Sequence, residues 1–303
     1  MMTFDSIKEQ LSSKKISVEE LTKNLLQTIN EKRHLNAFLN VFDGKAIQRA
    51  QEVDKKISSG TTGQLAGMVM CAKDNICFEN EVTTCGSKIL EKFVSLYDAT
   101  VIARLKKADV VFVGKTNLDE FAMGSSTESS AFGVTKHPLD ETRVPGGSSG
   151  GSAVAVAANM SVTALGSDTG GSVRQPAALC GIIGLKPTYG RVSRYGLVAY
   201  GSSLDQISVF GNCAKDVAQV LQVIAGHDEH DSTSANVSVP NYLEALNKNI
   251  SGLKIGIPKE YFSEGLNDEI RKAIFEQIEI LKSNGTTIKE ISMPNAEHVI
   301  PTY

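Results

Sequence analysis

Apolar side chains recur at two different spacings along the chain, and each spacing predicts one kind of element. Leu21, Leu25 and Ile29 repeat at every fourth position, which places them on one face of a helix. Ser17 begins a capping box directly before this run, so a helix is expected from residue 18 to about residue 33. Other segments follow the two-residue alternation or the short apolar runs that are typical of buried strands.

The remaining elements follow from the same two patterns. Helices are expected over residues 43–59, which Gly60 ends, over 98–108 with Asp98 as cap, and over 117–123, 216–225 and 267–284. Strands are expected over residues 67–72, 110–114, 162–165, 253–257 and 287–291, and loops over 124–144, 187–197 and 227–238. Because strands alternate with helices, the pattern predicts an α/β fold in layers.

Composition narrows the class of protein. The chain has 303 residues, of which 41% are hydrophobic and 21% charged, as in globular proteins with a sizeable core. The net charge of −3 argues against extensive contact with a nucleic-acid backbone. The sequence begins without the apolar segment of a signal peptide, and its 5 cysteines are scattered without a C-x-x-C pair. We therefore expect a cytoplasmic protein with reduced thiols and no metal site.

A stretch rich in glycine and serine, from Pro145 to Pro176, separates two of the predicted elements. Its two Gly/Ser clusters, residues 146–152 and 167–172, flank the small apolar residues 153–158. A flexible linker would not enclose an apolar run of this kind. The stretch therefore predicts a buried helix between two tight turns, and glycine allows the backbone of such turns to approach other groups closely.

The first cluster permits two kinds of serine chemistry. Residues 146–150 fit the G-x-S-x-G pattern of a nucleophile elbow, with Ser148 as nucleophile, but that mechanism needs a histidine. Only His227, His230 and His298 lie downstream, and we expect them to be exposed loop residues. Lys73, at the end of a predicted buried strand, is the other candidate base, because burial disfavours the charged form of a lysine. That role requires Lys73 to be buried and neutral.

Long blocks of sequence carry a resemblance to a known family. The blocks are Lys73–Asn75, Pro145–Ser152 and Gly166–Ala177, and the similarity continues through Gly181–Pro187. In these blocks the chain resembles the amidase signature family. The resemblance implies an α/β fold with a central mixed β-sheet covered by helices on both faces.

The same resemblance implies a mechanism built on a Ser–Ser–Lys triad. Ser172 would be the nucleophile, Ser148 would relay its proton, and Lys73 would be the base. The family holds the peptide bond between Gly147 and Ser148 in the cis form. Asp168 and Arg174 flank the nucleophile, and we expect them to form a structural ion pair. The backbone N–H groups expected in the oxyanion hole are those of Thr169, Gly170, Gly171 and Ser172, and the residues expected to bind substrate are Met123, Gly124, Ser125 and Tyr303.

Within this family, three further blocks are most similar to the glutaminase subunits of tRNA-dependent amidotransferases. They are Thr116–Glu128, Lys186–Leu197 and Ser202–Ile207. The similarity implies that the chain hydrolyses glutamine and supplies ammonia to convert Glu-tRNA(Gln) to Gln-tRNA(Gln). The implied partners are subunits B and C, which make most of the contact with tRNA; ATP and Mg would be used by a partner, and no cofactor is expected in this chain.

The resemblance also implies how the chain is organised. One amidase domain is expected over residues 1–303, with a helical segment over about 1–60, the Ser-Ser-Lys core over about 61–210 and an incomplete part over 211–303. Relatives continue well past Tyr303, so we expect a C-terminally truncated chain with an incomplete sheet. Two alternatives remain open, a stand-alone amidase acting on another amide and an inactive truncated scaffold.

Overall fold

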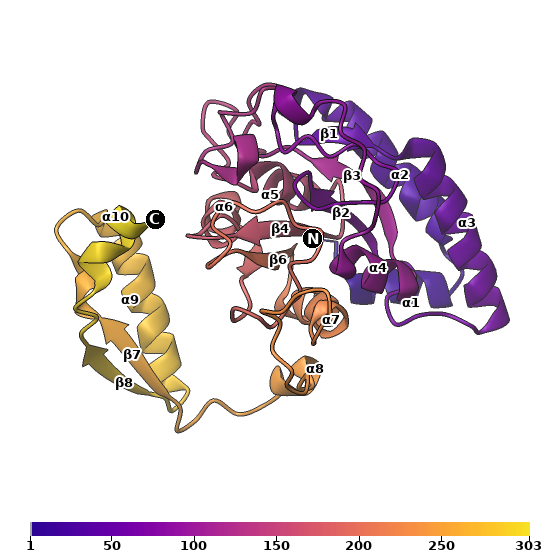
Figure 1. Ribbon diagram of the computed structural model, residues 1–303. Helices are drawn as coiled ribbons and strands as arrows, with labels where there is room; N and C mark the ends of the chain where they lie inside the picture. Colours follow the sequence, from indigo (N-terminus) through magenta and orange to yellow (C-terminus); the bar gives the residue numbers. More distant parts are fainter. Residues whose placement is uncertain (1) are drawn as a thin grey trace. The chain divides into compact units, whose positions relative to one another are not determined.

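The computed structural model describes residues 2–303, which divide into two units, Met1–Leu243 and Glu244–Tyr303 (Figure 1). The first unit contains a six-stranded sheet with the strand order β1-β3-β2-β4-β6-β5, and the second contains the two-stranded sheet β7-β8. The single domain expected over residues 1–303 stays a prediction, since each unit is described by itself.

The elements of the first unit have the following bounds. The strands are β1 (Phe38–Val41), β2 (Val69–Lys73), β3 (Val111–Thr116), β4 (Thr163–Asp168), β5 (Ile183–Leu185) and β6 (Gln206–Gly211). The helices are α1 (Phe4–Ser12), α2 (Val18–Glu31), α3 (Asp43–Ser59), α4 (Thr100–Lys107), α5 (Gly150–Ala157), α6 (Arg174–Cys180) and α7 (Ala214–Ile224), and α8 (Tyr242–Ala245) lies at the boundary between the units.

The sheet is mixed, as expected. Strands β3, β2 and β4 are parallel neighbours, whereas β1 pairs antiparallel with β3 and β6 pairs antiparallel with β4. Every residue of the three parallel strands is buried. This burial explains why their sequences read as continuous apolar runs, because both faces of a parallel sheet are covered by helices.

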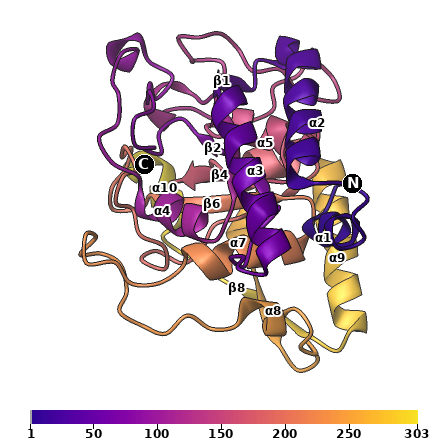
Figure 2. The ribbon, with the colours of Figure 1, turned by 90° about the vertical axis from the view of Figure 1, so that its right-hand side faces the viewer.

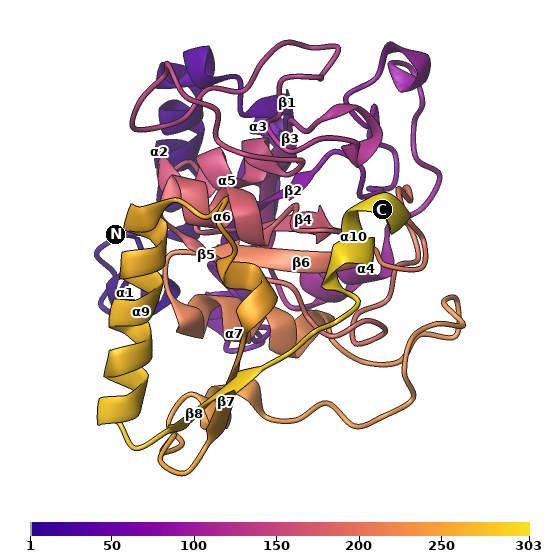
Figure 3. The same cartoon turned by 90° about the vertical axis from the view of Figure 1, so that its left-hand side faces the viewer.

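Helices cover both faces of this sheet. Helix α5 packs on β2, β3 and β4 from one face, and α7 packs on β5 and β6 from the other (Figures 1 and 3). Helices α2 and α3 pack against each other as a pair beside β3 (Figure 2). The small side chains of α5, all but one of them buried, let this helix lie close to the sheet. The expected buried helix between the two Gly/Ser clusters is therefore confirmed.

Local signals set the ends of the N-terminal helices. The Ser17 hydroxyl accepts the N–H of Glu20 (3.0 Å), and the Glu20 carboxylate accepts the N–H of Ser17 (2.8 Å), which is the predicted capping box at the start of α2. Helix α3 covers residues 43–59 and ends at Gly60, whose φ of 68° is the left-handed conformation that glycine adopts without strain. Both helices are confirmed.

Two local predictions were wrong. Asp98 does not cap α4, because its carboxylate accepts the N–H of Glu79 (2.9 Å) and binds Lys106 (2.7 Å). Residues 117–123 do not form a helix; only a single 3₁₀ turn, Glu120–Ala122, is present, and Phe121 within it has a φ of 50°. The buried Asp119 side chain accepts backbone N–H groups from the following loop, so that side chain–backbone bonds replace helical ones.

The second unit is a small strand–helix–strand arrangement. Strand β7 (Lys254–Pro258) and strand β8 (Thr287–Ile291) are parallel and are joined through α9 (Asp268–Ser283). A short helix, α10 (Val299–Thr302), precedes the last residue. The strands and the helix expected in this region from the sequence are confirmed to within one residue at each end. Across residues 2–303, no helix has both the length and the apolar character needed to span a membrane.

Candidate active site

Three parallel strands end at the same edge of the sheet and bring polar groups together there. Lys73, Thr116 and Asp168 are the last residues of β2, β3 and β4, and Lys73 pairs directly with Thr116. Carboxyl ends of parallel strands are the usual place for a site in an open α/β sheet, because the loops that follow them converge. The two Gly/Ser clusters enter at this edge, since one follows β4 and the other leads into α5.

Lys73 is wholly buried and lies next to the first of the predicted serines. Its Nζ is 2.6 Å from Ser148 Oγ and 2.9 Å from Ser167 Oγ. Burial lowers the pKa of Lys73 to about 7, because the charged amine loses its water, although the nearby carboxylates oppose this shift. The requirement that Lys73 be buried is therefore confirmed, and a large fraction of its amine is neutral near pH 7.

Ser148 is held by contacts on both sides. The peptide bond between Gly147 and Ser148 is cis, as the resemblance implied. The N–H of Gly147 donates to Gln175 Oε1 (3.0 Å), and the N–H of Asp119 donates to the carbonyl of Ser148 (3.2 Å). A Cβ atom on Gly147 would lie 2.2 Å from Asp119 Oδ2, so a larger residue does not fit here. These contacts fix the direction of the Ser148 hydroxyl toward Lys73.

Ser172 lies beside this pair through a backbone contact. It is 5% exposed, and its carbonyl accepts the N–H of Ser149 (3.2 Å). In residues 2–303, no hydrogen bond joins the hydroxyls of Ser148 and Ser172 directly. The structure thus brings Lys73 and Ser148 into contact and places Ser172 next to them. Hydrogen bonds within a catalytic site are often long until substrate binds.

The four amides predicted for the oxyanion hole do not have the same environment. The N–H of Gly171 donates to Asp168 Oδ1 (2.9 Å). The N–H groups of Thr169, Gly170 and Ser172 have no hydrogen-bond acceptor within residues 2–303, so they remain available to a developing negative charge. Their role in an oxyanion hole stays a prediction.

The ion pair expected beside the nucleophile is present. Arg174 binds Asp168 at 2.9 Å, and the wholly buried carboxylate also accepts the N–H groups of Gly171 and Val173. Burial alone would raise the pKa of Asp168, but the bonds to Arg174 and to the backbone hold it below its ordinary value. Asp168 is therefore a carboxylate that shapes the turn before Ser172.

The residues predicted to bind substrate fall in two places. The carbonyl of Ser125 accepts a hydrogen bond from Gln175 Nε2 (3.0 Å), and Gln175 also binds Gly147, so the loop with Met123, Gly124 and Ser125 lies beside the cis peptide. Tyr303 belongs to the second unit and is described only there. Substrate binding by these residues stays a prediction.

The sequence analysis gave no role to several residues that hold the site together. Ser167 accepts hydrogen bonds from both Lys73 and Asn75 (3.0 Å), while Asp119 and Gln175 fix the backbone on either side of the cis peptide. The sequence did contain a signal for Ser167 and Asn75, because both lie next to the ends of strands that pair with each other. Their hydrogen bonds, however, depend on side-chain directions that spacing does not define.

The histidine-dependent alternative finds no support in this geometry. No histidine is a hydrogen-bond partner of Ser148 in the described part of the chain. His227 bonds to Ser234, and His230 bonds to Asp228, so both belong to their own loop. Within residues 2–303, no group of three or more His, Cys, Asp or Glu side chains is arranged to hold a metal ion.

Comparison with known proteins decides the family. The family model described as Amidase matches residues 20–303. The chain belongs to the amidase family. Among curated amidase-family relatives, it is 53% identical over 98% of its length to the A subunit of the glutamyl-tRNA(Gln) amidotransferase of Carboxydothermus hydrogenoformans. It is 52% identical over 99% of its length to the corresponding protein of Salinibacter ruber.

Solved structures of amidase-family proteins agree with this assignment. The A subunit of the glutamyl-tRNA(Gln) amidotransferase of Thermotoga maritima superposes with a TM-score of 0.87 at 41% identity, and this match covers 100% of the present chain and 64% of the other. A peptide amidase from Stenotrophomonas maltophilia gives a TM-score of 0.88 at 32% identity and covers 98% and 63% of the two chains. The chain spans 62% and 59% of the length of the two curated relatives.

Proposed function

We propose that this chain provides the glutamine-hydrolysing site of a tRNA-dependent amidotransferase. The observation that carries the proposal is the buried pair of Lys73 and Ser148, with Ser172 beside it, in a chain that is 53% identical to the A subunit of such an enzyme. An amide needs a strong nucleophile and a means of stabilising negative charge, and these residues together with the free amides of residues 169, 170 and 172 offer both.

The reaction then follows from the roles of these groups. Neutral Lys73 accepts the proton of Ser148, and Ser148 accepts that of Ser172, whose oxygen attacks the side-chain amide carbon of glutamine. The carbonyl oxygen becomes negative and is bound by the backbone amides of the oxyanion turn. The proton returns through Ser148 to the leaving nitrogen, the C–N bond breaks and ammonia leaves. Water then hydrolyses the acyl-enzyme by the same route and releases glutamate.

The wider assembly is part of the same proposal. The ammonia would pass to the first of two partners, subunits B and C, which uses ATP and Mg to amidate Glu-tRNA(Gln), and the second would brace the pair in the cytoplasm. The identity of 53% to an amidotransferase chain supports this assembly more strongly than the 32% identity to a peptide amidase supports a stand-alone enzyme. The net charge of −3 fits a chain that leaves most contact with tRNA to its partner.

The proposal predicts modification of one serine by an electrophilic glutamine analogue. Incubation with 6-diazo-5-oxo-L-norleucine should label Ser172, located by peptide mass spectrometry, and excess glutamine should protect it. With subunits B and C present, ammonia release should increase on addition of tRNA and ATP. Rapid hydrolysis of simple amides without partners would support the stand-alone amidase instead. Absence of any label in a folded sample would support the inactive scaffold.

A second prediction concerns pH. If the neutral form of Lys73 is the base, the rate of Ser172 acylation should rise as pH increases and level off above about pH 8, because the pKa of Lys73 is lowered to about 7. An ordinary lysine would give a rate that still rises near its usual pKa of about 10.4. Stopped-flow measurement of p-nitrophenyl acetate acylation from pH 5.5 to 9.5 distinguishes the two. A rate that falls across this range would contradict the role of Lys73.

A further inference from the structure

The turn that carries the candidate oxyanion amides is held from outside by a residue of another strand. Asp168, the last residue of β4, pairs with Gln206, the first residue of β6. In an antiparallel pair, the next two residues along each chain, Thr169 and Asp205, therefore also face each other. Their side chains meet, and Thr169 Oγ1 donates a hydrogen bond to Asp205 Oδ1 at 2.5 Å. The side chain of Thr169 is thus fixed by a carboxylate outside the Ser–Ser–Lys triad.

Asp205 is itself held firmly. It is 2% exposed, and its carboxylate accepts the N–H of Tyr200 (2.8 Å) and the N–H of Gly201 (3.1 Å). The N–H of Asp205 donates to the carbonyl of Gly201 (2.9 Å), so residues 200–205 form a closed turn. Gly201 lies against Thr169, since a Cβ atom on Gly201 would come within 3.0 Å of Thr169 Cγ2. The turn therefore packs on Thr169 as well as bonding to it.

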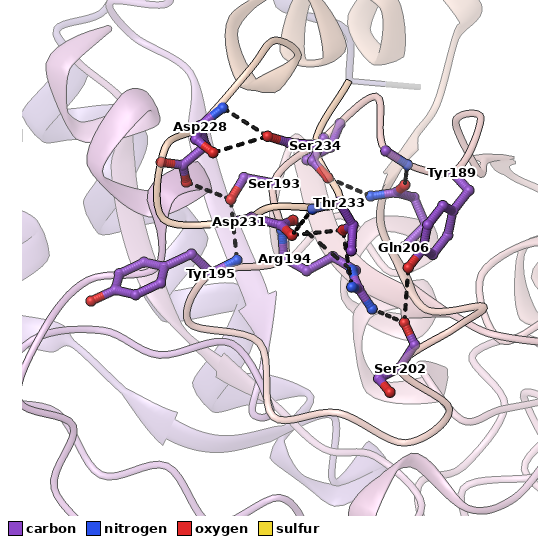
Figure 4. A network of polar contacts seen from close by, with 12 residues as sticks. Tyr189, Ser193, Arg194, Tyr195, Ser202, Gln206, Asp228, Asp231, Thr233 and Ser234 are labelled. Atoms are coloured by element: carbon purple, nitrogen blue, oxygen red, sulfur yellow. Dashed lines mark hydrogen bonds and ion pairs between the residues drawn. The ribbon is translucent and has the colours of Figure 1, made fainter. Parts of the chain in front are cut away.

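A second layer of contacts braces this turn (Figure 4). The Arg194 guanidinium and the Tyr189 hydroxyl both donate to the carbonyl of Ser202. Arg194 also donates to Thr233 Oγ1 (3.0 Å), and its N–H donates to Asp231 (2.8 Å), which ties the turn to the loop after α7. Because of this bracing, Asp205 does not have to move when Thr169 is pulled on.

We propose that Asp205 is a positioning residue that fixes Thr169 and thereby aims the N–H groups of residues 169 and 170 at the oxyanion. This inference rests on the proposed function, since it concerns the same acylation step. Charge stabilisation of this kind depends on donors that are already in place when the charge develops. Misplacement of such a donor by about 1 Å costs on the order of 10²-fold in rate. Loss of the Thr169–Asp205 bond should therefore slow acylation without weakening the binding of substrate.

The test removes this bond from either side. Thr169→Val deletes the hydroxyl, Asp205→Asn deletes the charge without a change of size, and each should lower the acylation rate constant for p-nitrophenyl acetate by about 10- to 100-fold. The Michaelis constant should change by less than about threefold. The double variant should be no slower than the slower single variant, because both remove the same interaction. Thr169→Ser, which keeps the hydroxyl, should lose less than Thr169→Val.

Asp216→Asn is the matched control. Asp216 is also a buried carboxylate, it also accepts a backbone N–H, that of Phe4, and it lies in α7, which follows the opposite end of β6. This variant should acylate at the wild-type rate. Independent effects of Thr169→Val and Asp205→Asn that multiply in the double variant would overturn the proposal, as would a change confined to the Michaelis constant.

Hydrogen exchange tests the proposal without any activity. In Asp205→Asn, the amides of Gly171 and Val173 should exchange several-fold faster than in the wild type, whereas they should be unchanged in Asp216→Asn. If the wild type is never acylated at Ser172, the proposed function fails, but the exchange result still decides whether Asp205 holds the turn. Unchanged exchange of these amides in Asp205→Asn would overturn the inference.

Discussion

Lys73→Met is expected to reduce the acylation of Ser172 by about 10²- to 10⁴-fold, the usual contribution of a general base. Methionine keeps the length of the side chain but cannot accept the proton of Ser148, which lies 2.6 Å from the amine in the wild type. Stopped-flow release of p-nitrophenol gives the rate, and peptide mass spectrometry confirms that Ser172 carries the acetyl group.

The fold should survive this substitution. The lowered pKa of Lys73 means that the folded protein disfavours the protonated amine, so this amine contributes least to stability below about pH 7 and progressively more as pH rises toward its unfolded pKa. Lys73→Met should accordingly be most stable relative to the wild type at acidic pH. Lys88→Met is the control for the acylation assay, because that side chain is 60% exposed. Wild-type acylation by a folded Lys73→Met protein would refute the Ser–Ser–Lys assignment.

The sequence predicted the site better than it predicted the elements around it. Lys73, Ser148 and Ser172 lie in long blocks with a strong family resemblance, and the structure brings all three to one edge of the sheet. The roles of these residues could be proposed because the blocks combine a strand-end lysine with two glycine-buffered serines. The two hydroxyls, however, are not in direct contact, and spacing along the chain does not contain that information.

Elements that depend on distant partners were missed. The short strand β1 has four half-buried residues and exists because it pairs with β3, and β6 exists because it pairs with β4 and β5. Helix α6 contains Pro176 within its first turn, a position where proline is tolerated but which reads in sequence as a turn. Helices α2 and α3, whose caps are local, were predicted with nearly correct ends.

The second large effect concerns the other wholly buried lysine near the site. Lys115 lies in β3, and its Nζ is 2.7 Å from Asp74 Oδ1, 2.6 Å from Thr83 Oγ1 and 2.9 Å from the carbonyl of Val82. Lys115 and Asp74 are 0% and 1% exposed. Unlike Lys73, this lysine is paired with a carboxylate, and together they tie the loop after β2 to the sheet. We therefore assign Lys115 to stability and not to proton transfer.

Lys115→Met is expected to lower the free energy of unfolding by about 3–5 kcal/mol, because it leaves the buried carboxylate of Asp74 without its counter-charge. Urea denaturation followed by circular dichroism measures the loss. The double variant Lys115→Met/Asp74→Asn removes both charges and should be more stable than Lys115→Met alone. In contrast, Lys88→Met breaks an exposed pair with Glu91 and should cost less than about 1 kcal/mol.

The position of Asp74 links this stability to the site. Asp74 directly follows Lys73, and its Oδ2 accepts the N–H of Thr84 (2.8 Å), so the buried pair holds the chain just beyond the end of β2. In Lys115→Met the folded fraction should still acylate Ser172, since Lys73 keeps its own contacts with Ser148 and Ser167. A variant of full stability that has lost acylation would reverse the roles given to the two lysines. A large loss of stability with acylation kept per folded molecule would show that one buried lysine holds the loop while the other serves the reaction.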